Sequence, residues 1–361
     1  MGFNCGVIGL PNVGKSTIFN ALTSAAAEMA NYPFCTIDPN RGVVPVPDER
    51  LEKIASILHR DDPIPTRIEF IDVAGLVKGA SRGEGLGNRF LGHIRNVDAL
   101  VHVVRCFPAA DVVHVTGDVD TIRDVEIVNT ELMIADLEVL DKASGKLSKA
   151  ALSGDREIQT QVRVMERCVE HLNEGKPLKT LDLHDDELLH LREFGLITLK
   201  PVLYCANIDE ENSCGEQVKR LESHAGDEHS AFITLSGKLE EEISELPEDE
   251  KQEYLQGMGV GESGLKRLIH ASYELLALIT YYTAATELQA WTLRRGTNAL
   301  RAAGKIHTDF ERGFIRAEVY GFEDLIAAGT EHAVREAGKL RSEGKDYVIQ
   351  DGDIVHYLFN V

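Results

Sequence analysis

The sequence lacks the features that would tie it to a membrane, to export or to a zinc site. No apolar run reaches the roughly 18–20 residues that a helix needs to cross a bilayer. No basic leader with an apolar centre precedes the first predicted strand, so we expect no secretory signal, no membrane partner and a cytoplasmic location. The six cysteines lie far apart, without a Cys-x-x-Cys pair or the Cys/His spacing of a zinc site, so we expect reduced thiols.

Positive charge is also scarce. The chain holds 38 Lys and Arg against 59 Asp and Glu, a formal net charge of −21, and residues 207–256 alone hold four against 15. Affinity for nucleic acid depends on cationic groups that release counterions. We therefore expect no DNA partner, and any contact with RNA must use a local basic surface. The 361 residues, 43% hydrophobic and 27% charged, indicate a globular chain of more than one domain.

A phosphate-binding motif stands near the start of the chain. Residues 9–16 read Gly-Leu-Pro-Asn-Val-Gly-Lys-Ser, a complete G-x-x-x-x-G-K-[ST], between a buried strand at 5–8 and a helix from 17. The glycines let backbone N–H groups approach phosphate oxygens, and the helix N-terminus adds partial positive charge. We expect Lys15 to reach the β- and γ-phosphates and Ser16 to coordinate Mg²⁺. The expected phosphate-binding residues are Asn12, Val13, Gly14, Lys15, Ser16 and Thr17.

Further groups for phosphoryl transfer follow the next apolar strand. Residues 66–73 predict a strand that runs into Asp72-Val73-Ala74-Gly75, the D-x-x-G pattern of nucleotide triphosphatases. We expect Asp72 to hold Mg²⁺ through water and the Gly75 N–H to meet the γ-phosphate. Thr36, in a loop at 31–38, is a candidate second hydroxyl ligand of Mg²⁺, and an ordinary turn threonine is the alternative.

The residue after this motif is Leu76, where Ras-like proteins carry the glutamine that orients the attacking water. Leucine cannot orient water, so slow intrinsic hydrolysis is expected unless another polar group enters the site. Of the possible substitutes we favour His114, which follows the apolar strand at 99–105, whereas His102 lies inside that strand and suits a core histidine. The other possible substitutes are Arg82, Arg89 and His93.

The base-reading motif departs from the guanine pattern. The strand at 201–206 ends in Asn207-Ile208-Asp209-Glu210, where GTPases of this layout carry Asn-Lys-x-Asp. Ile208 replaces the lysine, and Glu210 is one methylene longer than the aspartate that pairs with guanine, so that bidentate geometry should be lost. Asn207 can still pair with a purine edge. We expect ATP to be preferred over GTP, with Ser236, after the strand at 231–235, completing the base pocket beside Ile208.

These motifs together resemble the YchF-type Obg-like ATPases, a branch of the translation-factor-related GTPases, and the resemblance covers essentially the whole chain. The phosphate-binding loop, Leu76, the glycine-rich stretch after it and Asn-x-x-Glu at 207–210 match in order. The resemblance implies ATP hydrolysis without a catalytic glutamine, assistance by K⁺ held through Asn12, and association with ribosomes. Family members also place a histidine near position 114.

Two accessory regions complete the expected organisation. Apolar residues spaced by three and four within 129–200 predict two helices that turn at residues 153–155 and pack as an antiparallel coiled coil. Lys142, Lys146, Lys149, Arg156 and Arg163 on its outer faces could meet RNA or face solvent. Residues 279–361 predict short strands with helices and look like a TGS domain, a β-grasp docking module. Its plausible contact residues are Arg294, Arg295, Arg301 and Lys305.

The expected fold is therefore α/β: a P-loop NTPase domain with a mostly parallel sheet, at residues 1–128 and 201–278. The helical coiled-coil insertion at 129–200 interrupts it, and the α+β TGS-like domain at 279–361 follows. The expected function is an ATP-binding and slowly hydrolysing switch that associates with ribosomes or RNA through the hairpin and the TGS-like domain. The alternative is a GTPase or an RNA-binding module in which hydrolysis is only a timer.

Overall fold

The computed structural model divides the chain into two compact units. The first comprises Met1–Val43 with Glu69–Ser272, and the second comprises Val44–Ile68 with Tyr273–Val361. None of the helices in the described part of the chain combines the length and the apolarity that a membrane crossing needs. The structure describes residues 2–29, 40–73, 86–108, 119–151, 154–209 and 215–360.

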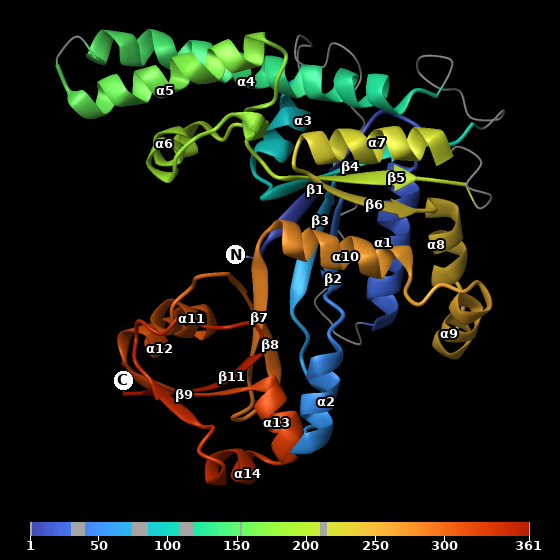
Figure 1. Ribbon diagram of the computed structural model, residues 1–361, viewed down its shortest axis with the longest axis vertical. Coiled ribbons are helices and arrows are strands. Elements are labelled where there is room, and N and C mark those ends of the chain that lie inside the picture. Colours follow the sequence, from blue (N-terminus) through green and yellow to red (C-terminus); the bar gives the residue numbers. More distant parts are fainter. Residues whose placement is uncertain are drawn as a thin grey trace. The chain divides into compact units, whose positions relative to one another are not determined.

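The first unit is built on a six-stranded sheet in the order β2-β3-β1-β4-β5-β6. Pairings β1 with β3, β1 with β4, β4 with β5, and β5 with β6 are all parallel. Helices α4 and α7 cover one face and α1 and α10 the other (Figure 1). The strands are β1 Asn4–Ile8, β2 Arg41–Pro45, β3 Arg67–Asp72, β4 Ala99–Arg105, β5 Val202–Asn207 and β6 Ala231–Leu235. The helices are α1 Lys15–Met29, α3 Leu86–Arg95, α4 Thr121–Ala151, α5 Arg156–Asn173, α6 Asp185–Leu191, α7 Gly215–Asp227, α8 Gly237–Ser244, α9 Glu248–Gly257 and α10 Gly264–Leu275, with 3₁₀ turns η2 Leu178–Thr180 and η3 Arg192–Phe194.

The centre of this sheet sets the position of the functional site. All seven residues of β4 are buried, as a strand with parallel neighbours and covered faces requires. Because β1, β3, β4 and β5 run in one direction, their carboxyl ends meet at one edge of the sheet, where ligands bind in open α/β folds. Sequence periodicity predicted β4 and β6 with the bounds that the structure shows.

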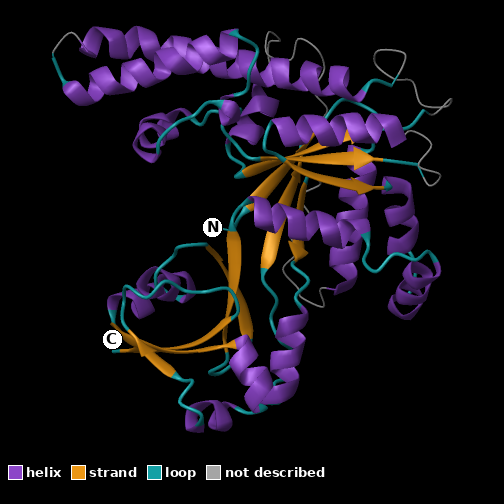
Figure 2. Ribbon diagram, viewed as in Figure 1, coloured by secondary structure: helices purple, strands orange, loops and turns teal. Residues whose placement is uncertain are grey.

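The helical insertion is an antiparallel pair formed by α4 and α5 (Figure 2). Its first helix begins at Thr121, eight residues before the predicted boundary, because its first turns belong to the core: Val125 packs with Val104, Tyr204 and Leu221. Further along, Leu140 packs against Val164, Met165 and Cys168 of α5. Asp155 caps α5 by accepting hydrogen bonds from two backbone N–H groups. The hairpin therefore extends a helix whose first turns pack in the core of the first unit.

The second unit carries a five-stranded mixed sheet in the order β10-β9-β11-β7-β8. Strand β7 pairs parallel with β11 and antiparallel with β8, and β9 pairs antiparallel with β10 and β11. Helix α11 lies beside this sheet (Figure 1), and its buried alanines contact Tyr281 and Val319. The elements are β7 Leu278–Thr283, β8 Gln289–Arg294, α11 Ala299–Ile306, α12 Thr308–Arg312, β9 Phe314–Gly321, α13 Phe322–Ala328, α14 Glu331–Glu336, β10 Arg341–Glu343 and β11 Asp353–Phe359.

A segment from the first third of the chain also belongs to the second unit. Residues 44–68, which the sequence analysis had placed in the P-loop domain, form helix α2 (Glu49–Leu58) in this unit. The apolar face of α2 packs Leu51, Ile54 and Ala55 against Tyr282 and Ile354. The apolar face of α2 therefore packs against the five-stranded sheet. The sequence pattern alone did not indicate which of the two sheets this face would contact.

One carboxylate of the acidic run between residues 240 and 253 is buried and capped into the fold. Glu240 is 4% exposed, and its carboxylate accepts hydrogen bonds from the backbone N–H groups of Gly264 (2.6 Å) and Leu265 (3.3 Å) at the start of α10. Burial raises the pKa of Glu240, and these hydrogen bonds oppose the rise. One member of the run is thus a helix cap.

Candidate nucleotide site

The loop between β1 and α1 has the backbone conformation of an anion cradle. Gly9 and Gly14 have φ of 150° and 96°, and Asn12 has φ of 62°. A Cβ on Gly9 would lie 2.4 Å from the Val103 carbonyl oxygen, and one on Gly14 would lie 2.1 Å from Nδ2 of Asn207. Only glycine fits both positions, because the backbone must be left-handed and closely approached. The loop then delivers the chain to the N-terminus of α1, where partial positive charge favours phosphate.

Lys15, the first residue of α1, is 6% exposed and points back over this loop. Its ammonium donates hydrogen bonds to the carbonyl oxygens of Gly9 (3.1 Å) and Leu10 (2.6 Å). Burial lowers the pKa of Lys15 to about 8, and the negative charge of Asp72 opposes that fall. The loop thus holds a buried cation that gains from an incoming anion.

Asp72, at the end of β3, and Ser16, beside Lys15 on α1, form the candidate Mg²⁺ position. Burial raises the pKa of Asp72, while the charge of Lys15 and a hydrogen bond with Ser16 lower it. Its Oδ1 atom is buried with no hydrogen-bond partner among the described residues. A hydroxyl beside an unsatisfied buried carboxylate oxygen fits a hard cation that prefers oxygen ligands and keeps several waters.

Asn207 has a role that the sequence analysis did not assign. It is 4% exposed, its Nδ2 donates to the carbonyl oxygen of Val13 (2.9 Å), and its Oδ1 accepts from the N–H of Gly237 (2.9 Å). The amide expected at the purine edge thus ties the phosphate loop to the loop after β6. The Ser236 side chain accepts from the N–H of Leu239 and caps α8. Both residues brace loops around the site.

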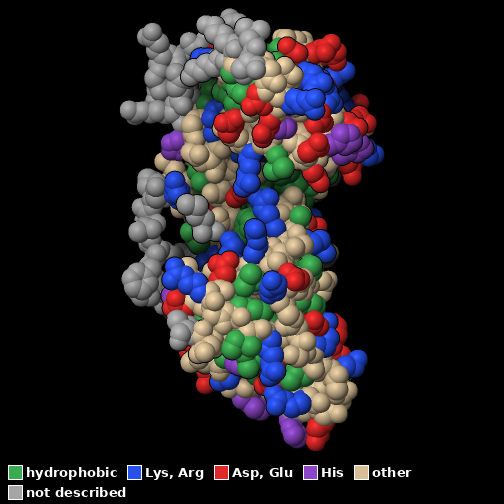
Figure 3. Space-filling view, turned by 90° about the vertical axis from the view of Figure 1, so that its left-hand side faces the viewer, with side chains coloured by type: hydrophobic (Ala, Val, Ile, Leu, Met, Phe, Trp, Pro, Cys, Tyr) green, Lys and Arg blue, Asp and Glu red, His purple; other side chains and the backbone are tan. Residues whose placement is uncertain are grey.

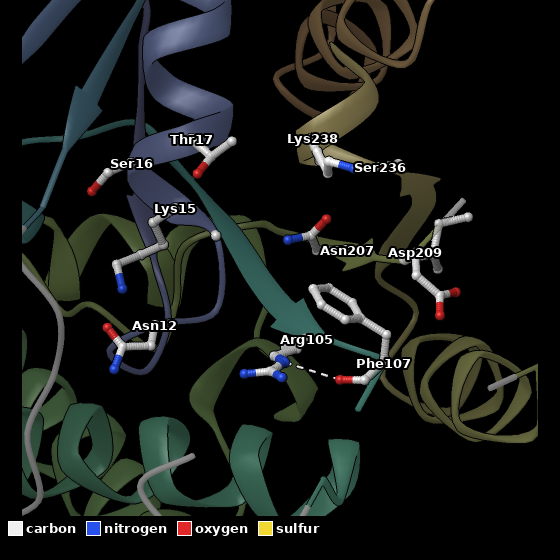
Figure 4. A pocket seen from close by; sticks show the side chains of 12 residues that line it. Asn12, Lys15, Ser16, Thr17, Arg105, Phe107, Asn207, Asp209, Ser236 and Lys238 are labelled. Atoms are coloured by element: carbon white, nitrogen blue, oxygen red, sulfur yellow. Dashed lines mark hydrogen bonds between the residues drawn. The ribbon is translucent and has the colours of Figure 1, made fainter. Parts of the chain in front are cut away.

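A cavity of about 660 Å³ opens between these loops (Figure 4). Of the predicted nucleotide-binding residues, Val13 contributes its backbone bond to Asn207, and the others that are described line the cavity: Asn12, Gly14, Lys15, Ser16, Thr17, Asn207, Ile208 and Ser236. Asp72 is not among the lining residues. Four lining residues were not assigned a role from sequence: Arg105, Phe107, Asp209 and Lys238. Each ends a parallel strand of the sheet, lies two residues after one, or lies in the first turn of the helix that follows one. That place in the sequence was the available signal.

Several predicted residues lie outside the described part of the chain: Thr36, Gly75, Leu76, Arg82, His114 and Glu210. Their roles remain predictions. His102 is 2% exposed within β4, beside the Tyr204 ring, and burial lowers its pKa to about 3. It is the core histidine that the sequence favoured. His93 lies on α3 and is exposed, and it is not among the residues that line the cavity.

The strand order, the phosphate loop and the paired Ser16 and Asp72 define the class of protein: a P-loop nucleoside triphosphatase of the GTPase type. Two family models match the chain. One, described as a 50S ribosome-binding GTPase, matches residues 4–140. The other, the C-terminal domain of YchF GTPases, described as a protein of unknown function, matches residues 278–360.

Comparison with individual proteins identifies the family. The chain is 49% identical over 363 residues to the ribosome-binding ATPase YchF of Haemophilus influenzae, covering all of both chains. It is 48% identical over 366 residues to the protein of that name from Bacillus subtilis, again covering all of both chains. The solved structure of the Schizosaccharomyces pombe YchF GTPase is 36% identical, with a TM-score of 0.89 over 99% of this chain and 98% of that one. The chain belongs to the YchF family.

Proposed function

We propose that this protein binds and hydrolyses ATP as a nucleotide-dependent switch that associates with ribosomes. The observation that carries the hydrolytic part is the buried Lys15 at the phosphate loop, with Ser16 beside the half-buried Asp72, within a chain that matches YchF ATPases over its full length. The sequence motifs indicate no other catalytic centre, so we propose that hydrolysis takes place in this cavity.

The reaction would be in-line attack of water on the γ-phosphate. The loop N–H groups and Lys15 would hold the phosphate oxygens, and Ser16 and Asp72 would hold Mg²⁺, which neutralises charge that develops on those oxygens. Thr36 and the Gly75 N–H would join them from segments outside the described residues. Because Leu76 replaces the glutamine, we assign His114 to the attacking water and K⁺, held by Asn12, to the remaining charge.

The preference for ATP rests on the end of the cavity away from the phosphate loop. Ile208 and Phe107 line it with apolar surface, and Asp209 and Lys238 add charge. No lysine stands at 208, and Glu210 is longer than the aspartate that pairs with guanine. The relatives differ in name, since the bacterial proteins are called ATPases and the fission yeast structure a GTPase.

Competition calorimetry with Mg²⁺ present tests this proposal directly. We expect tighter binding of ATP than of GTP, and a shift toward GTP when Ile208→Lys is combined with Glu210→Asp. Lys15→Ala should abolish binding of both. Turnover measured in K⁺ and in Na⁺ separates the cation role, because loss of Asn12 should remove the K⁺ advantage. No heat with either nucleotide would contradict the proposed function.

For the ribosome contact we propose the hairpin and the TGS-like unit. Because ribosomes are the proposed partner, the proposed location is the cytoplasm. Acidic and basic side chains alternate over the hairpin at the top of Figure 3. Lys142 pairs with Glu138 (3.7 Å), and Arg163 donates to Thr160. In the second unit, four exposed cations lie at the end of β8, in the turn after it and on α11: Arg294, Arg295, Arg301 and Lys305. They are further candidates for contacts with RNA phosphates.

Sedimentation with ribosomes separates a switch from a timer. A switch predicts that wild-type binding differs between ATP and ADP and that Lys15→Ala no longer responds to nucleotide. Full binding by Lys15→Ala in every nucleotide condition would contradict switching. Combined substitution of Arg294 and Arg301 to Gln should weaken binding. Combined substitution of Lys219 and Lys266 to Gln, on exposed positions of α7 and α10, removes the same charge outside the proposed surfaces and should not.

A further inference from the structure

Arg105 ends β4 in an unusual environment for a guanidinium. It is 1% exposed, yet it lines the nucleotide cavity. Its strand position is opposite Asn207 of β5, and the next N–H, that of Cys106, donates to the carbonyl oxygen of Asn207 (2.9 Å). The backbone at the end of β4 is therefore bonded to the same residue that braces the phosphate loop.

From this position Arg105 makes two contacts with Phe107. Its Nε donates to the Phe107 carbonyl oxygen (2.9 Å), and its guanidinium carbon lies 4.8 Å from the centre of the Phe107 ring. In Figure 4 the dashed line marks the hydrogen bond, and the ring projects into the cavity on the side of Asn207 and Asp209. A planar cation over an aromatic face and a charged hydrogen bond both favour one placement of that ring.

A buried carboxylate of the helical insertion adds its charge to this environment. Asp124, in the first turn of α4, is 2% exposed, and its Oδ1 lies 3.9 Å from Nε of Arg123. Burial lowers the pKa of Arg105, and the negative charge of Asp124 opposes that fall. The placement of Arg105 over Phe107 therefore rests on its own two contacts with that residue.

Phe107 and Ile208 are the large apolar residues of the cavity lining. The Phe107 ring lies away from Lys15 (Figure 4), and an aromatic face there suits a purine ring. We propose that Arg105 is a positioning residue that fixes Phe107 as a wall for the base and thereby determines affinity for the nucleoside part of the ligand. This inference rests on the proposed function. It assigns Arg105 to the base and not to the phosphates.

Two ligands distinguish these assignments: ATP, and inorganic tripolyphosphate, which has no base. For Arg105→Met in the full chain, we expect Mg·ATP affinity to fall about tenfold, the scale of one lost charged hydrogen bond, while tripolyphosphate affinity changes less than twofold. Arg163→Met, on the exposed hairpin surface, should change neither.

A double-mutant cycle completes the test. Phe107→Ala should weaken ATP binding, and Arg105→Met added to it should cost little more, because the two act through one wall. An equal loss for ATP and tripolyphosphate, or additive losses in the cycle, would overturn the inference. If Arg105→Met does not fold, Arg105→Lys carries the same comparison. Failure of the wild type to bind ATP would instead refute the proposed function.

Discussion

Lys15 shows how burial and charge oppose each other at a single residue of this site. Its pKa lies at about 8, below the usual 10.5, so between these values the folded state binds fewer protons than the unfolded state. Stability therefore rises with pH across that window, and below it the buried charge costs about 3 kcal/mol. A phosphate chain beside Lys15 would reverse this cost by favouring the charged form.

Nucleotide binding should consequently take up a proton at mildly alkaline pH. At pH 8.5 we expect Mg·ATP binding to the wild type to take up about 0.7 proton, because most free protein then carries a neutral Lys15. Calorimetry in two buffers of different ionisation enthalpy measures this number. The same pair of buffers at pH 7 is the control, with uptake near zero. Equal heats in both buffers at pH 8.5 would contradict the assignment.

Among the elements, η2 of the insertion is joined to α7 and β5 by a buried charge network. Lys179 lies 2.6 Å from Oε2 of Glu228 and donates to Oγ of Ser230 (2.7 Å). The Tyr204 hydroxyl donates to the same carboxylate (2.7 Å). Burial raises the pKa of Glu228, but contacts with His224, Lys179 and Tyr204 outweigh it and lower the value to about 2. The insertion is thus anchored to the sheet.

This network predicts a pH-dependent stability difference. A depressed carboxyl pKa stabilises the fold above the unfolded value of about 4.5, and that contribution is lost as pH falls toward 2. Glu228→Gln should lower the free energy of unfolding by about 3 kcal/mol at pH 7. The difference from wild type should shrink between pH 4.5 and 2. Urea unfolding followed by far-UV circular dichroism measures both.

Glu222→Gln supplies the comparison for that experiment. Glu222 is exposed on the same helix, α7, so its neutralisation should change stability little at any pH. If Glu228→Gln behaves like Glu222→Gln at pH 7, the ion pair does not anchor the insertion. A constant deficit down to pH 2 would instead show that the loss is steric.

At the scale of the whole molecule, local sequence pattern predicted which segments form helices, strands and the phosphate loop better than it predicted which of them pack together. The phosphate loop and the buried strand β4 were recognisable because glycine spacing and apolar runs are local signals. The sequence analysis did not assign Arg105 and Phe107 to the site, because their contacts with each other at the cavity are visible only in the folded structure. The capping role of Glu240 has no local signal, since its N–H partners lie 24 and 25 residues away.

The most instructive miss is the membership of residues 44–68. The amphipathic pattern of α2 does not indicate which of the two sheets its apolar face packs against. Three kinds of contact join residues 44–68 to the rest of the second unit. Arg50 pairs with Asp351 (2.8 Å), and the Tyr282 hydroxyl donates to Asp48. The backbone of Ile64 exchanges hydrogen bonds with Leu288 and Ala290, both 2.9 Å. The last domain is therefore not one continuous stretch of chain.

This arrangement makes residues 273–361 incomplete when they are expressed alone. Without α2, the cluster around Tyr282, Leu288 and Ile354 loses Leu51 and Ile54 as cover, and exposed apolar surface of this kind binds hydrophobic dyes. We expect the isolated segment to bind such a dye and to melt broadly, and a synthetic peptide of residues 44–68 to suppress the dye signal and raise Tm.

The same peptide with Ile54→Asp should do neither, because a carboxylate would enter the apolar cluster without a partner. A segment that melts sharply without the peptide, at a Tm that the peptide leaves unchanged, would show that the five-stranded sheet is sufficient and that α2 only rests on it.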